Sequence, residues 1–70
     1  MPKSSRFQIE GMRCEHCSQR IKSLLEARPG VQLADVSLEN KEARVLYDNT
    51  AVSEQNLKKI IEEAGYNVVG

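Results

Sequence analysis

Apolar and polar residues alternate in short runs along the chain, and this two-residue period predicts strands. Residues 6–10 form the first such run. Residues 31–38 and 43–47 predict two more strands, which the polar turn at residues 39–41 joins as a hairpin. A last, short strand is expected at residues 66–69.

The alternation also predicts which side chains face the core. Those expected inside are Phe7, Ala34, Val36, Leu38, Ala43, Val45 and Tyr47. Val31 and Leu33 fall on the opposite parity from the inward residues that follow them. Because a one-residue slip moves a side chain to the other face of a sheet, we expect the second strand to begin irregularly.

Two stretches carry apolar residues at the spacing of an amphipathic helix. The first follows the cysteines and ends at Pro29 and Gly30, because proline cannot continue a helix and glycine accepts a left-handed turn. Ser53 is a favourable N-cap for the second, flanked by Val52 and Leu57 as a hydrophobic staple. The predicted stripes are Ile21, Leu24, Leu25 and Arg28 in the first helix, and Leu57, Ile60, Ile61 and Ala64 in the second, which Gly65 ends.

The order strand, helix, strand, strand, helix, strand is the ferredoxin-like split β-α-β pattern of α+β proteins. It predicts a four-stranded antiparallel sheet with two helices on one face and the other face open. Residues 1–5 are predicted to be a polar tail, and residues 6–70 a single domain.

Composition narrows the function classes. The 70 residues include ten cationic and ten acidic side chains, which argues against a strongly basic nucleic-acid binder. No apolar run approaches the roughly 20 residues of a membrane span, and we expect no direct membrane insertion. The first residues lack the apolar segment of a secretion signal, so a cytoplasmic location is expected.

Cys14 and Cys17 are the two cysteines of the chain. Two are too few for a disulfide framework, and a closed zinc site needs four ligands. Cys14 is expected in the loop after the first strand and Cys17 in the first turn of the helix, where unpaired N–H groups and the helix dipole favour thiolate. Two soft thiolates with few other ligands suit Cu(I) best among biological metals.

Residues 11–17, Gly-Met-Arg-Cys-Glu-His-Cys, resemble the GMxCxxC signature of the heavy-metal-associated domain family. The resemblance extends over residues 6–69 and includes Pro-Gly-Val at 29–31 and Gly-Tyr at 65–66. It implies a Cu(I)-binding module of ferredoxin-like fold, either a small copper chaperone or an N-terminal domain of a heavy-metal P-type ATPase. In that family the two cysteines bind the metal and pass it on by ligand exchange, roles that fall on Cys14 and Cys17.

Four further residues are candidates for tuning the site. His16 and Tyr66 are similar to the residues of bacterial, CopZ-type copper chaperones; we expect Tyr66 near the loop and His16 as a solvated neighbour of the sulfurs. Met12 is expected to pack under the loop instead of binding metal. Arg13 stands where copper-binding members most often carry Thr or Ser and several zinc transporters carry Asp. The missing carboxylate argues against zinc, and the Arg13 cation either offsets the charge of a bis-thiolate centre or contacts a partner.

Several alternatives stay open from sequence alone. The partner implied is a copper-transporting P-type ATPase or a copper-responsive regulator, and a metal-bridged homodimer using His16 is a separate possibility. Binding of zinc or mercury is the alternative within the family, and thiol–disulfide exchange is the alternative outside it. Residues 1–30 carry six cationic and three acidic side chains, so Arg13, Arg20 and Lys3 are candidates for a docking surface around the loop.

Overall fold

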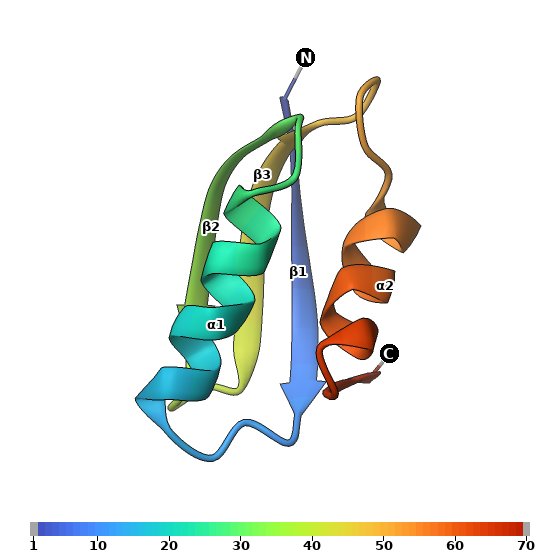
Figure 1. Cartoon of the computed structure of the whole chain (residues 1–70). Coiled ribbons are helices and arrows are strands. Elements are labelled where there is room, and N and C mark those ends of the chain that lie inside the picture. Colours follow the sequence, from blue (N-terminus) through green and yellow to red (C-terminus); the bar gives the residue numbers. More distant parts are fainter. Residues whose placement is uncertain (1, 70) are drawn as a thin grey trace.

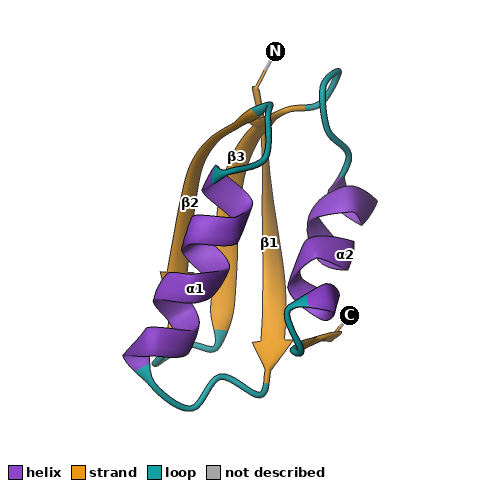
Figure 2. Cartoon of the chain, in the orientation of Figure 1, coloured by secondary structure: helices purple, strands orange, loops and turns teal. Residues whose placement is uncertain are grey.

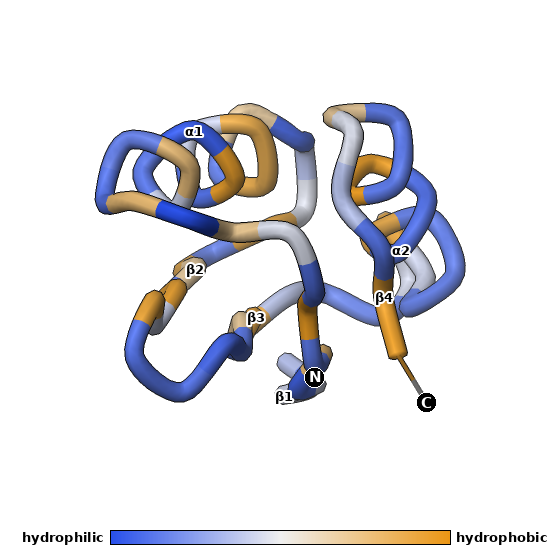
Figure 3. Tube along the Cα trace, turned by 90° about the horizontal axis from the view of Figure 1, so that it is seen from below, coloured by the Kyte–Doolittle hydropathy of each residue, from blue (hydrophilic) through white to orange (hydrophobic). Residues whose placement is uncertain are grey.

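The computed structural model describes residues 2–69, whose elements follow the predicted order (Figure 1). They are β1 (Pro2–Glu10), α1 (Glu15–Glu26), β2 (Val31–Ser37), β3 (Glu42–Asp48), α2 (Glu54–Glu63) and β4 (Asn67–Val69). The strands form an antiparallel sheet in the order β2-β3-β1-β4. Both helices lie on one face of this sheet, as Figures 2 and 3 show. This arrangement confirms the ferredoxin-like prediction.

The core lies between the sheet and the two helices. Its buried members are Phe7, Ile9, Met12, Ile21, Leu25, Ala34, Ala43, Val45, Tyr47, Val52, Leu57 and Ile61. The alternation on β3 is therefore confirmed, whereas Val36 and Leu38 are only partly buried. Leu24 was predicted in the buried stripe of α1 but is 39% exposed. Successive residues of a helix are about 100° apart, and Ile21 and Leu25 are one turn apart on its buried side. Leu24 therefore lies to one side of the line that joins them.

The predicted tail over residues 1–5 is wrong for residues 2–5, because β1 begins at Pro2. Residues 2–8 pair continuously with β3, from Pro2 opposite Asp48 to Gln8 opposite Glu42. Ser5 is buried, and its hydroxyl lies 2.9 Å from the hydroxyl of Tyr47. This contact gives a buried tyrosine its polar partner, which an apolar residue at position 5 would not supply. Met1 and Gly70, also covered by the domain predictions, lie outside the described residues.

Smaller departures concern the strand ends. β2 ends at Ser37, and a register shift between Val31 and Leu33 confirms its irregular start. β4 begins at Asn67, one residue later than predicted, so Tyr66 belongs to the connection from α2. The Ser53 cap is confirmed: its hydroxyl accepts the Asn56 N–H at 3.2 Å.

The topology places three connections at one end of the molecule. These are the loop from β1 to α1, the β2–β3 turn and the link from α2 to β4, all at the lower end in Figure 1. Residues far apart in sequence therefore meet around the cysteines.

Candidate metal centre

The loop that follows β1 turns sharply and is anchored in the core. Gly11 has a φ of +101°, a backbone conformation that residues with a Cβ rarely adopt. A Cβ built at Gly11 would lie 3.6 Å from a ring carbon of Tyr66, so the tyrosine packs beside the start of the loop. The next residue, Met12, is 7% exposed and belongs to the core cluster. Its thioether is thus turned into the protein, and it fixes the loop by packing.

Cys14 is the N-cap residue of α1, and Cys17 lies in the first turn. The Cys14 backbone is extended, and its carbonyl accepts the Cys17 N–H at 3.1 Å and the Ser18 N–H at 3.4 Å. The two sulfurs are 3.6 Å apart, and both cysteines are free. Cys14 is exposed and Cys17 is half-buried. Because metal–thiolate bonds are about 2.3 Å long, a single ion can contact both sulfurs at this separation.

The surroundings of Cys17 favour its thiolate form. The pKa of the Cys17 thiol is lowered from 9.0 to about 7, first by hydrogen bonding from the Tyr66 hydroxyl and next by the backbone of Arg13 and the thiol of Cys14. The same pairing raises the pKa of Tyr66. A thiolate at neutral pH is the form that binds a metal and attacks as a nucleophile.

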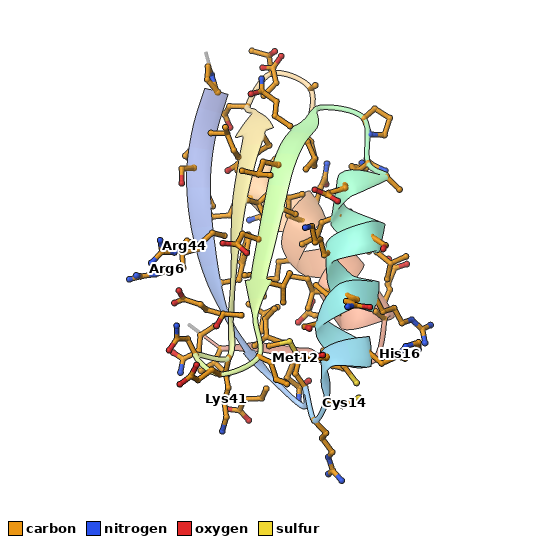
Figure 4. All side chains as sticks on the ribbon, turned by 90° about the vertical axis from the view of Figure 1, so that its left-hand side faces the viewer. Arg6, Met12, Cys14, His16, Lys41 and Arg44 are labelled. Carbon is orange, nitrogen blue, oxygen red and sulfur yellow. The ribbon has the colours of Figure 1, made fainter. Side chains whose placement is uncertain are left out.

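The side chains of His16 and Arg13 are not part of this cluster, although the Arg13 backbone contacts Cys17. Both are exposed, and Figure 4 shows His16 on the outer side of α1, away from the sheet. Within residues 2–69, no three His, Cys, Asp or Glu side chains gather at metal-binding spacing. The structure therefore brings Cys14, Cys17 and Tyr66 together and leaves His16 outside that group.

Lys3 is not near the loop, which corrects its proposed place in the docking surface. It lies at the start of β1, opposite Tyr47, whereas the loop leaves the end of that strand. The seven residue-to-residue steps from Lys3 to Glu10 separate the two by roughly 23 Å at about 3.3 Å per step along a strand. Sequence reasoning instead missed Lys41, which the β2–β3 turn brings to the loop end (Figure 4). The predicted element order contained the signal, because it sends that turn to the same end as the loop.

These features match a known domain. The family model described as the heavy-metal-associated domain matches residues 6–67. The chain belongs to the heavy-metal-associated domain family. The copper chaperone CopZ of Staphylococcus epidermidis is 43% identical over 62 residues, which cover 89% of this chain and 91% of that protein.

Solved structures of the heavy-metal-associated family have the same fold. A structure described as the CopZ metallochaperone has a TM-score of 0.93 at 40% identity and covers 96% of this chain and 100% of its own. The Cu(I)-loaded N-terminal domain of a potential copper-translocating P-type ATPase from Bacillus subtilis has a TM-score of 0.92 at 32% identity, covering 97% of this chain and 85% of its own. Within residues 2–69, no helix of this family member is long and apolar enough to cross a bilayer.

Proposed function

We propose that this protein is a metallochaperone that holds Cu(I) between Cys14 and Cys17 and carries it in the cytoplasm. The observation that carries the proposal is a pair of free thiols, 3.6 Å apart, at an open end of the molecule. Soft thiolate ligands select Cu(I), whereas a structural zinc site requires four ligands. The CopZ relatives support the same assignment.

The proposed mechanism is metal carriage by ligand exchange, with no catalytic step. A thiolate of the partner adds to the bound ion and gives a three-coordinate intermediate. One original cysteine then leaves and takes up the proton that the second partner thiol loses as it binds the ion. The second original cysteine leaves as a thiolate, which balances the partner thiolate that added first. Cys14 is the first point of exchange because it is the more exposed of the two. A Cys14→Ser variant that transferred copper at the wild-type rate would contradict this order.

We propose a copper-transporting P-type ATPase as the acceptor. The likeness to the Cu(I)-loaded ATPase domain supports this choice, since that domain has a similar fold and holds the same ion. A copper-responsive regulator is a second acceptor, and a homodimer bridged by metal through His16 is a further state of the loaded protein. In the bridged dimer, the exposed imidazole would approach the metal of the other copy.

The test is an anaerobic Cu(I) titration of the reduced protein against a strong chromogenic Cu(I) chelator, with Zn(II) as competitor. We expect tight 1:1 binding that the Cys14→Ser/Cys17→Ser double variant loses and that zinc leaves unchanged. His16→Ala should have little effect on affinity, because His16 lies outside the sulfur cluster. The proposal fails if wild-type protein does not withhold copper from the chelator.

The same structure also suits an N-terminal domain of an ATPase, because such a domain superposes on nearly the whole chain. Copper delivery distinguishes a chaperone from an ATPase domain, because a chaperone transfers copper as a separate molecule.

The zinc arm of the titration tests the remaining alternative, a site for another soft metal such as zinc or mercury. Displacement of Cu(I) by Zn(II) would favour that alternative.

A further inference from the structure

The β2–β3 turn fixes a lysine beside the metal loop. Lys41 has a φ of +56°, and its carbonyl accepts the Ile9 N–H at 2.7 Å. This hydrogen bond ties the turn to the end of β1, two residues before Gly11. Figure 4 shows Lys41 and Cys14 at the same end of the molecule. The position of Lys41 relative to the cysteines is therefore set by the sheet.

A shallow hollow, which we call the cation hollow, separates the turn from the loop. It encloses about 370 Å³ and is lined by Gln8, Glu10, Gly11, Met12, Arg13 and Lys41. Its charged groups are the two cations and the Glu10 carboxylate. None of these three forms an ion pair within residues 2–69, where the salt bridges join Glu42 to Arg6 and Arg44. The hollow thus has a net charge of +1 that a single carboxylate would neutralise.

We propose that the cation hollow receives one acidic side chain of the protein that takes copper from this one. The inference rests on the proposed function and names the chemistry of its partner. Arg13 directly precedes Cys14, the exposed ligand. A partner carboxylate between Arg13 and Lys41 is therefore held at the end of the molecule that carries Cys14.

A partner carboxylate in the cation hollow should change the rate at which the two proteins associate more than the affinity of their complex. Exposed ion pairs contribute little net stability, but charges at the rim of an interface raise the association rate and make it dependent on salt. Arg6 and Arg44 differ from the cations of the hollow because they already form ion pairs. They lie opposite each other on the open face of the sheet, and their Nε atoms share Glu42 at 3.8 and 3.3 Å. Their charges are already engaged, whereas the two cations of the cation hollow have no ion pair within residues 2–69.

The experiment measures the second-order rate of Cu(I) transfer to the N-terminal domain of the Bacillus subtilis ATPase, by stopped flow. Lys41→Glu should slow transfer about threefold or more at low ionic strength, because it reverses a steering charge. Glu10→Gln should accelerate transfer, because it removes the carboxylate that opposes the incoming one. Both differences should vanish near 1 M salt, where the screening length is about 3 Å.

Lys3→Glu is the matched control, since it makes the same charge change at the far end of β1. The proposal is overturned if Lys41→Glu transfers at the wild-type rate, if Lys3→Glu is slowed as much, or if Glu10→Gln is slower than wild type. It is also overturned if Lys41→Glu changes Cu(I) affinity in the chelator assay, since the lysine would then act on the metal site. Failure of the wild type to deliver copper is a separate result, which contradicts the proposed function.

Discussion

At the scale of single residues, several hydrogen bonds together lower the pKa of Cys17 to about 7, and the one from the Tyr66 hydroxyl is the largest cause. Tyr66→Phe removes this hydroxyl and keeps the ring against Gly11. We expect the pKa of Cys17 to rise part of the way to its ordinary value, because the Arg13 backbone and the Cys14 thiol still favour thiolate. Alkylation of Cys17 at neutral pH should then slow, and the midpoint of its pH profile should move upward.

Tyr47→Phe is the control for that measurement. It also removes a tyrosine hydroxyl, but one that is buried against Ser5 far from the cysteines. It should lower the free energy of unfolding by about 1 kcal/mol, the usual net contribution of a hydrogen bond, and leave the pH profile of Cys17 unchanged. Equal profiles for Tyr66→Phe and wild type would show that the hydroxyl does not act on the thiol.

The sequence indicates the two cysteines and their chemistry, because the CxxC spacing and the helix start are local features. It indicates Tyr66 only through the family resemblance, since the contact with the loop depends on the link from α2. It misplaces Lys3 and misses Lys41 for a related reason. A charge count along the chain does not show at which end of a strand each charge lies.

At the scale of elements, the two helices begin alike but with different capping residues. Cys14 and Ser53 both have extended backbones, yet the serine hydroxyl accepts an N–H of its helix whereas the Cys14 side chain makes no capping hydrogen bond. Ser53→Ala should therefore destabilise the protein by about 1 kcal/mol. Cys14→Ser should stabilise the metal-free protein by a smaller amount, because it supplies the missing cap. The first turn of α1 thus gives up helix stability for a metal ligand.

Thermal and urea unfolding of the reduced, metal-free variants measures both effects. A 1 kcal/mol change corresponds to roughly 4–8 °C in Tm for a domain of this size. Ser23→Ala is the control, an exposed serine within α1 whose replacement should shift stability by less than about 0.5 kcal/mol. A Cys14→Ser protein less stable than wild type would mean that the thiol, not the cap, holds the loop.

Element type and order follow from periodicity, because each amphipathic run needs a sheet or a helix face to bury it. Periodicity does not predict that the first residues of β1 form a strand. Pro-Lys-Ser-Ser has no apolar alternation, and these residues pair because β3 is long enough to extend the sheet beside them. The exposed Leu24 shows the converse, since an apolar residue at helical spacing can still lie at the edge of the buried stripe.

At the scale of the whole molecule, the excess of positive charge in residues 1–30 does not form one face. β1 lies between β3 and β4, and α1 packs on β2, so the two halves of the sequence are interleaved. A docking partner meets one end or one flank of the molecule, so the charge of that end or flank determines the attraction. Arg20 lies toward Tyr66, where its positive charge partly opposes the rise in the pKa of that hydroxyl. Lys22 instead lines a hollow with Asp35 on the β2 side. The two are about 200° apart around α1.

This geometry separates two substitutions that sequence alone would treat as equivalent. Arg20→Glu should slow copper transfer to an acidic partner at low salt, because it reverses a charge on the flank that carries Cys17 and Tyr66. Lys22→Glu, with the same change of net charge, should leave the rate near that of wild type because it faces away from the exchanging sulfurs. Transfer rates over a salt series test this, with Cu(I) affinity measured in parallel. Equal slowing by both variants would mean that the partner senses the net charge of the molecule and not a defined docking flank.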